Sequence, residues 1–190
     1  METESARIPA LERAPTWRLR IAYSYSRRRF GKVLTTLKVL YARAPALLGP
    51  LQALLASEAR LKRLEPSLRL LIKARVAAIN GCSFCVDIAQ CAADPDLRAR
   101  LVLVAQDPAS PLLSQAERAA LQFVEEATRF RTVGDSTFEA LRVCFSEAAI
   151  VEITWLNALE NFLNLTTVPL KIGSDGLCAL KARAPGAAHL

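Results

Sequence analysis

The chain is organised around residues 79–91, which read INGCSFCVDIAQC. Cys82 and Cys85 are three residues apart, a spacing that places both sulfurs on one face of a helix. Asn80 and Gly81, just before them, are residues that can cap or open a helix. We therefore expect the two cysteines in the first turn of a helix, near enough to form a disulfide.

This position favours redox chemistry. The unpaired backbone N–H groups at a helix start, and the positive end of the helix dipole, stabilise a thiolate relative to a thiol. A second thiol on the same turn can close a small disulfide ring once the first sulfur has been attacked. Cys82 and Cys85 are therefore the candidate catalytic residues.

Length and composition predict one all-α domain. The chain has 190 residues, 52% of them hydrophobic, which is enough for a large buried core and leaves apolar surface for a subunit interface. Strand formers are sparse, whereas alanine, leucine and arginine are abundant. We expect a basic N-terminal arm and first helix over residues 1–45, followed by a helical domain with a C-terminal tail over residues 46–190.

The sequence predicts a cytoplasmic protein with no membrane partner. No uninterrupted apolar run reaches the roughly 18 residues that a spanning helix needs. The start, Met1–Glu4, is acidic and is not followed by the apolar segment of a secretory signal. Five cysteines without such a signal favour a redox or metal role for the close pair. The isolated cysteines are expected to be small buried hydrophobes: Cys91, Cys144 and Cys178.

Positive charge is concentrated in the N-terminal part of the chain. Residues 1–75 hold 16 Lys and Arg against 5 Asp and Glu, and the remainder holds 9 against 13. This pattern indicates either an anionic partner or a basic face that docks on the acidic part of a neighbouring subunit. The cluster Arg27–Arg29 is accompanied by no base-reading motif, so we expect no nucleic-acid partner.

Apolar periodicity and turn residues divide the chain into helices. Ser114–Glu117 and Ser136–Glu139 fit capping boxes, and Ser146 fits a helix cap. The segment that Ser146 opens is apolar on most sides, so we expect it to be the central helix. The expected helices cover residues 17–31 (an arm or a short helix), 34 to about 45, 46–63, 66–79, 81 onward, 114–129, 136–144 and 147–164.

Other chemistries find little support in the sequence. It contains no glycine-rich phosphate loop and no metal-spaced histidines, and its one histidine, His189, is penultimate and poorly placed to act as a base. A structural zinc site needs four ligands, and no second CxxC is present to complete one. We expect neither a metal nor a cofactor.

Three segments in order resemble a known family. Residues 80–85, residues 145–153 and the ending 164–178 are similar to the carboxymuconolactone decarboxylase and alkylhydroperoxidase D-like (AhpD-like) family, with the likeness running over 47–177. The resemblance implies a helical bundle that assembles as dimers, trimers or hexamers. It also implies thiol peroxidase or disulfide reductase activity on a peroxide or disulfide, with a separate reductant protein. By resemblance, Cys85 attacks and Cys82 resolves.

The chain departs from the family at the proton relay. Redox-active relatives carry a glutamate twelve residues before the first cysteine and a histidine four residues after the second, where this chain has Leu70 and Ala89. Glu152 and Glu160, eight residues apart in an apolar helix, share a face, and Glu160 is our tentative substitute relay residue. The alternative is a partly exposed helix edge or an ion pair with an arginine.

These features together predict an antioxidant thiol–disulfide oxidoreductase, of the peroxiredoxin type, that uses the Cys82–Cys85 pair. The alternative is a family member that has lost catalysis and binds a ligand or a partner. A decarboxylase-type lyase is less favoured, because such family members rely on histidine and do not need a CxxC.

Overall fold

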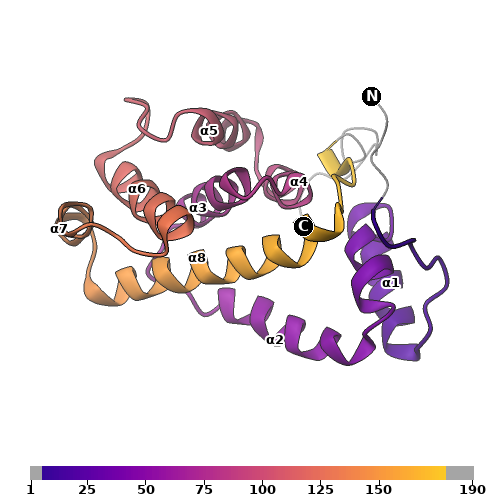
Figure 1. Cartoon of the computed structure of the whole chain (residues 1–190). Helices are drawn as coiled ribbons and strands as arrows, with labels where there is room; N and C mark the ends of the chain where they lie inside the picture. The colour runs from indigo at the N-terminus through magenta and orange to yellow at the C-terminus, as the bar shows by residue number, and fades with distance from the viewer. Residues whose placement is uncertain (1–5, 179–190) are drawn as a thin grey trace.

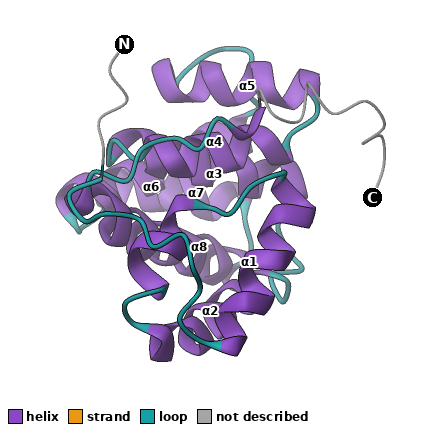
Figure 2. Ribbon diagram, turned by 90° about the vertical axis from the view of Figure 1, so that its right-hand side faces the viewer, coloured by secondary structure: helices purple, strands orange, loops and turns teal. Residues whose placement is uncertain are grey.

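The computed structural model describes residues 6–178, and every regular element in this part of the chain is helical (Figures 1 and 2). The all-α prediction is confirmed, and the fold is a multi-helix bundle of the AhpD-like type. Residues Met1–Glu4 and His189, which the sequence singled out, lie outside the described residues. The α-helices are, in chain order, α1 (Trp17–Phe30), α2 (Leu48–Glu58), α3 (Pro66–Ile79), α4 (Ser83–Ala92), α5 (Pro95–Gln106), α6 (Gln115–Phe130), α7 (Asp135–Cys144) and α8 (Glu147–Thr167).

Helix α3 lies at the centre of the bundle, in contact with α4, α5, α6 and α8 (Figure 1). Pro66 occupies its first turn, where the missing N–H is not needed. Ile72 and Val76 face a core shared with α6 and α8, while Leu71 and Ala74 face a second core shared with α4, α5 and α6. Because it is apolar on two sides, α3 holds the helix that carries the cysteines against the rest of the molecule.

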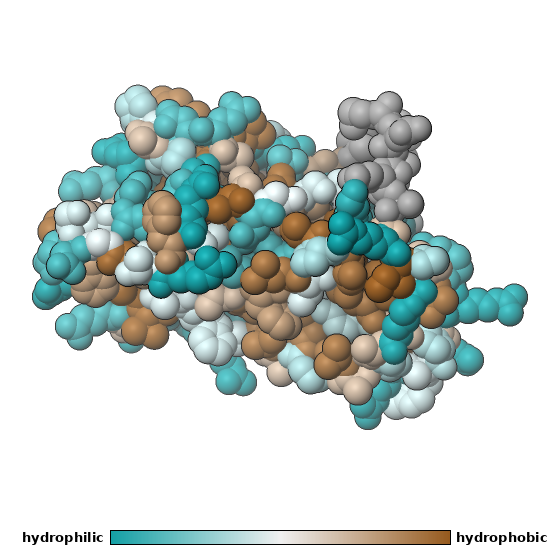
Figure 3. All heavy atoms as spheres, viewed as in Figure 1, coloured by the Kyte–Doolittle hydropathy of each residue, from teal (hydrophilic) through white to brown (hydrophobic). Residues whose placement is uncertain are grey.

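The helix after Ser146, expected to be the central helix, contacts α3, α4, α6 and α7 but is not buried on all sides. This helix, α8, packs one side on the core but leaves an apolar stripe on the other, with Val151 67%, Trp155 47% and Leu165 60% exposed. Apolar side chains gather over α8 and α2 in the space-filling view (Figure 3). An all-round apolar pattern predicts burial, but it does not distinguish a core from a surface available to another molecule.

The N-terminal part forms a separate apolar cluster that contains Leu19, Tyr23 and Leu48. The helix expected from residue 34 to about residue 45 is shorter in the structure. Residues 35 and 36 are helical and continue into a π-helix, Leu37–Tyr41, which packs in this cluster. The division of the chain after residue 45 stays a prediction.

The capping patterns give one correction. Ser114 and Glu117 form the predicted capping box, and Ser146 caps α8. The second box is wrong, because α7 begins at Asp135, with Gly134 as its N-cap and no side-chain cap. Glu126 of α6 accepts the N–H of Gly134 at 2.9 Å instead, so a contact from another helix replaces the local one.

None of the helices between residues 6 and 178 combines the length and the apolar character that crossing a lipid bilayer requires.

Candidate functional site

The cysteine turn is built by the close succession of two helices. Helix α3 ends at Ile79, and Gly81 turns the chain with a φ of 68°, a conformation that glycine adopts without a steric penalty. Helix α4 then begins with Cys82 as its N-cap. The expectation that Asn80 and Gly81 cap this helix is therefore corrected, because they end α3 and the cysteine itself caps α4.

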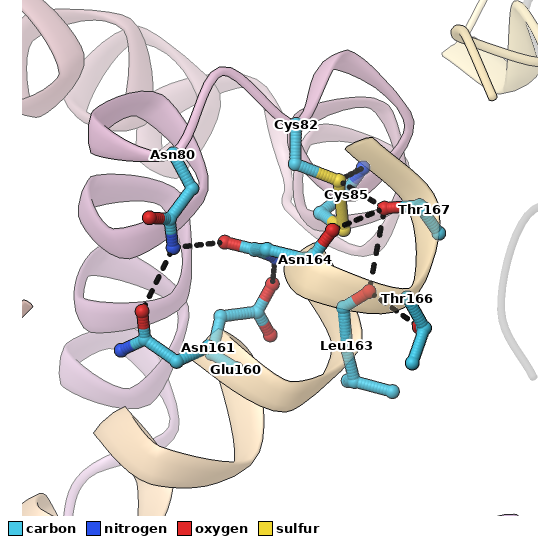
Figure 4. Close-up of a disulfide and its surroundings, with 9 residues drawn as sticks. All are labelled: Asn80, Cys82, Cys85, Glu160, Asn161, Leu163, Asn164, Thr166 and Thr167. Atoms are coloured by element: carbon cyan, nitrogen blue, oxygen red, sulfur yellow. Dashed lines mark hydrogen bonds between the residues drawn. A yellow bond between two sulfur atoms is a disulfide. The ribbon is translucent and has the colours of Figure 1, made fainter. Parts of the chain in front are cut away.

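Cys82 and Cys85 are joined by a disulfide bond, with their Cα atoms 5.3 Å apart (Figure 4). The Sγ atom of Cys82 accepts a hydrogen bond from the backbone N–H of Cys85 at 3.2 Å. Both residues are buried, with 1% of Cys82 and 8% of Cys85 exposed. The two sulfurs thus point toward each other on one turn, as the spacing predicts, and a helix N-terminus faces the first of them.

A hydroxyl group from a distant part of the chain reaches the same sulfur. The Oγ1 atom of Thr167, at the end of α8, lies 3.1 Å from Sγ of Cys82, in a buried contact. The hydroxyl of Thr167 also donates to the carbonyl oxygen of Asn164 at 2.9 Å. Sequence reasoning missed Thr167, because 85 residues separate it from Cys82 and no local pattern connects them.

Glu160 lies in a network of amide side chains next to the cysteine turn (Figure 4). Its carboxylate accepts a hydrogen bond from Nδ2 of Asn164 at 2.8 Å, and Oδ1 of Asn164 accepts one from Nδ2 of Asn80 at 3.0 Å. The same Nδ2 atom of Asn80 donates to Oδ1 of Asn161 at 2.9 Å. Asn164 therefore contacts both groups, Glu160 through its side-chain amide and the hydroxyl of Thr167 through its backbone carbonyl, and Thr167 in turn contacts the sulfur of Cys82.

The carboxyl group of Glu160 is almost completely buried, with 2% of the residue exposed. Burial raises its pKa above the ordinary value, because the charged form loses its hydration. The charge of Lys73 and the hydrogen bond from Asn164 act in the opposite direction, and the charge of Glu58 adds to the increase. Glu160 is thus a buried acid whose hydrogen-bond partner, Asn164, lies next to the cysteine turn.

Glu152 has a different position. Its carboxylate accepts the backbone N–H groups of Lys62 at 3.2 Å and Arg63 at 2.9 Å. It therefore fastens the segment before α3 to α8, and these hydrogen bonds go to that segment and not to the cysteine turn.

Apolar side chains, Leu70 and Ala89, occupy the two positions where redox-active relatives carry the glutamate and the histidine of the proton relay. Ala89 is 2% exposed and belongs to the apolar cluster of Leu101 and Leu121, and Leu70 packs against the same cluster. A charged or polar group at position 89 would be buried among these side chains without a partner, whereas Leu70 is only partly buried. The two residues that stand in place of the relay groups therefore contribute to the packing of this apolar cluster.

A hollow of about 360 Å³ opens beside Cys82 and is also lined by Asp87 and Ser174. The carboxylate of Asp87 accepts the hydroxyl of Ser174 at 2.8 Å and the N–H of Leu177 at 3.0 Å. These bonds place the segment 173–177 along one edge of the hollow. The carboxylate of Asp87 is thus engaged with this segment.

The same segment is fastened at a second point. The carboxylate of Asp175 accepts the N–H of Thr35 at 2.8 Å and its hydroxyl at 2.7 Å, and it pairs with Lys32 at 2.8 Å. Asp87 and Asp175 together hold segment 173–177 between α4 and the loop after α1.

The remaining cysteines are dispersed, with Cys91 buried and Cys144 and Cys178 partly exposed. Within residues 6–178, no group of three or more His, Cys, Asp or Glu side chains is placed to hold a metal ion.

Comparisons with known proteins agree with this site. Residues 45–126, which include the cysteine pair, match the carboxymuconolactone decarboxylase family. The uncharacterised Escherichia coli protein YnjA is 30% identical over 179 residues, which are 92% of this chain and 94% of YnjA.

Two crystal structures have the same fold. A protein of unknown function from Agrobacterium tumefaciens, provisionally assigned as the antioxidant defence protein AhpD, is 30% identical with a TM-score of 0.64, over 72% of this chain and 96% of that one. A peroxidase-related protein from Silicibacter sp. TM1040 is 21% identical with a TM-score of 0.74, over 92% and 95%, and this likeness concerns the fold alone. The matched segment, the sequence identity to the relatives and the shared helical bundle support one conclusion. This chain belongs to the carboxymuconolactone decarboxylase family, among its AhpD-like members.

Proposed function

We propose that this chain is an antioxidant thiol–disulfide oxidoreductase in which Cys82 and Cys85 form the redox couple. One observation carries the proposal, namely that the two sulfurs are bonded on one turn at the N-terminus of α4, with a hydroxyl group beside the first. The structural relative from Agrobacterium tumefaciens, provisionally assigned to antioxidant defence, supports the same class of activity.

The reaction uses a hydroperoxide as oxidant. A thiolate attacks the outer oxygen of the hydroperoxide, the O–O bond breaks, and the leaving alkoxide takes up a proton to become an alcohol. The sulfenic acid that results is attacked by the second thiol, which forms the disulfide and releases water. A dithiol reductant then restores both thiols by exchange and is itself oxidised to a disulfide.

The contacts of Cys82 support a thiolate at this position. The N–H of Cys85 donates to its sulfur, and the dipole of α4 adds positive potential. The hydroxyl of Thr167, which bonds Asn164 in the disulfide state, lies within reach to donate to a negative sulfur. The family resemblance makes Cys85 the attacking residue, whereas these contacts favour Cys82, and we propose Cys82 as the attacker.

Glu160 is the proposed substitute for the missing relay groups. Its carboxyl group is linked to the cysteine turn through Asn164 and Thr167. An amide does not readily pass a proton, so Glu160 acts on the sulfur through the position and polarity of Asn164 and Thr167. It is a positioning residue. Its loss would change the pH dependence of the reactivity of the thiol and would leave the fold in place.

The experiment that tests the function follows the thiols of the full-length protein. The reduced protein, freed of reductant, receives one equivalent of cumene hydroperoxide, and intact mass and free thiols are measured. We expect a mass loss of about 2 Da with two thiols consumed. Cys82→Ser and Cys85→Ser abolish this change, while Cys144→Ser, a partly exposed cysteine outside the pair, retains it.

The second candidate function is that of a binding protein without catalysis. Its supporting observation is the apolar packing of Leu70 and Ala89, which removes both relay groups. In that case the reduced thiols would stay unmodified under the same peroxide, and both cysteine-to-serine variants would behave like the wild-type chain.

We further propose that the chain assembles as a homo-oligomer. The exposed side chains Val151, Trp155, Phe162 and Leu165 recur at intervals of four, seven and three residues and share one face of α8. Water contact with this stripe is unfavourable by roughly 25 cal/mol for each Å² of apolar surface. A dimer, trimer or hexamer that covers it, in the cytoplasm, is the expected state, and the identity of the reductant protein is left open.

A further inference from the structure

Three arginines meet at one hollow on the N-terminal part of the molecule. The hollow has a volume of about 310 Å³, and Arg13, Arg20 and Arg27 line it together with Glu12 and Tyr23. Arg20 and Arg27 are seven residues apart on α1, so they lie on the same side of the helix. Arg13 comes from the segment that precedes α1.

Hydrogen bonds hold this segment in place. The hydroxyl of Tyr23 donates to the carbonyl oxygen of Leu11 at 2.9 Å, and the N–H of Leu11 donates to the carbonyl oxygen of Lys38 at 3.1 Å. The carboxylate of Glu12 is paired with the ammonium of Lys38 at 3.0 Å. The acidic group of the hollow is therefore paired with a lysine outside it, and the backbone that carries Arg13 is held against α1.

The positive charge of the hollow is not balanced from within the described chain. Among residues 6–178, none of the three arginines takes part in an ion pair, although Arg75 and Arg100 pair with Glu125 and Glu117 elsewhere. Three guanidinium groups around one hollow repel one another, so an anion placed between them would be attracted by all three.

We propose that this hollow binds a phosphate group. A guanidinium presents parallel N–H donors that match two oxygens of a phosphate, and three of them can surround a dianion from different sides. The volume is that of a small-molecule site, with room for the phosphate and part of the group that carries it. The proposal concerns a site separate from the cysteine pair and stands whether or not the redox function does.

The phosphate can belong to a free small molecule or to a lipid headgroup. The outward face of α1, beside the hollow, carries Trp17, Ile21 and Tyr25, which are 65%, 60% and 65% exposed. A lipid surface would cover these side chains together with the arginines, whereas a free phosphate compound would leave them in water.

The test measures binding of pyrophosphate to the full-length protein by titration calorimetry at low ionic strength. The variant Arg20→Gln/Arg27→Gln removes two charges from the hollow, and Arg28→Gln/Arg29→Gln removes two from the same helix outside it. We expect saturable binding of one pyrophosphate per chain, weakened about 10-fold or more by the first variant and within about 2-fold by the second. Circular dichroism melts check that both variants fold.

Vesicles distinguish the source of the phosphate. The site is assigned to a lipid headgroup if the protein co-sediments with phosphatidic acid vesicles but not with phosphatidylcholine vesicles, and if this co-sedimentation depends on Arg20 and Arg27. Binding of pyrophosphate without co-sedimentation assigns it to a free phosphate compound. The proposal is overturned if pyrophosphate does not saturate, or if the two double variants lose binding equally, because the effect is then one of overall charge.

Discussion

The Sγ atom of Cys82 lies 3.1 Å from the Oγ1 atom of Thr167, so the end of α8 supplies a hydrogen-bonding group to the N-cap residue of α4. This contact is polar support for the sulfur in a site whose usual relay positions hold Leu70 and Ala89. A hydroxyl can be buried here because its hydrogen bond to the backbone of Asn164 is satisfied, whereas an unpaired charge would lose its hydration.

Replacement of Thr167 by valine, which has the same shape, should raise the pKa of the Cys82 thiol by about one unit, since a hydrogen bond to a charged group is worth about 1.5 kcal/mol or more. Thr167→Ser should retain the wild-type value. The measurement is the pH dependence of the alkylation rate of Cys82 in the Cys85→Ser background. Equal pKa values in the two variants would show that the hydroxyl does not act on the sulfur.

Glu160→Gln should change how stability depends on pH. The raised pKa of Glu160 means that the folded state holds this proton more tightly than the unfolded state. Its contribution to stability is therefore present below the ordinary pKa of 4.5 and is lost as the pH rises through the folded value. The variant, which has no such titration, should gain in Tm relative to the wild type as the pH rises above 4.5.

If the Tm difference between Glu160→Gln and the wild type stays constant as the pH rises above 4.5, Glu160 is not a buried carboxyl group with a raised pKa. The same variant tests the positioning role, because the alkylation pH profile of Cys82 should shift with Glu160→Gln. Glu139→Gln, an exposed glutamate on α7, is the matched control and should alter neither profile.

The sequence predicted the helical class, most helix positions and the cysteine pair, because these depend on local spacing. Helical periodicity marked α3 and α6, and the three-residue spacing placed both sulfurs on one turn. The sequence also singled out Glu160, on the argument that an apolar helix has no need of a charge.

The features that the sequence did not predict depend on contacts between residues that are far apart in the chain. Thr167 and Asn164 reach the cysteine turn only because α8 packs beside α3 and α4. The exposure of one face of α8 could not be foreseen either, since its apolar residues are equally compatible with a core. The cap of α7 was misassigned because Glu126, on another helix, competes with the local side chain.

The exposed stripe of α8 predicts a defined effect on assembly. Phe162→Glu places a charge in the middle of this stripe and should shift the protein toward the monomer in light scattering coupled to size-exclusion chromatography. Val143→Glu introduces the same charge at a 78% exposed apolar position on α7 and should leave the mass unchanged. If both variants keep the mass of the wild-type protein, the exposed stripe of α8 does not form the subunit interface.

The segment 173–177 should control access to Cys82. Asp175→Asn weakens the ion pair with Lys32 and the bonds to Thr35, and so loosens the edge of the hollow. We expect reduced Cys82 to be alkylated about 3-fold faster or more, because the local opening becomes easier. Asp107→Asn, which alters an exposed turn bond to Ala109, is the control. No difference between the two variants would show that the segment does not limit access.

The most direct test of the redox account is the pKa of the Cys82 thiol in the Cys85→Ser variant, measured as the pH dependence of alkylation with the modified peptide identified by mass. The account predicts a value well below about 8.5, the ordinary value for a cysteine. A value at or above it, together with thiols that stay unmodified under peroxide in the wild-type chain, would contradict the account.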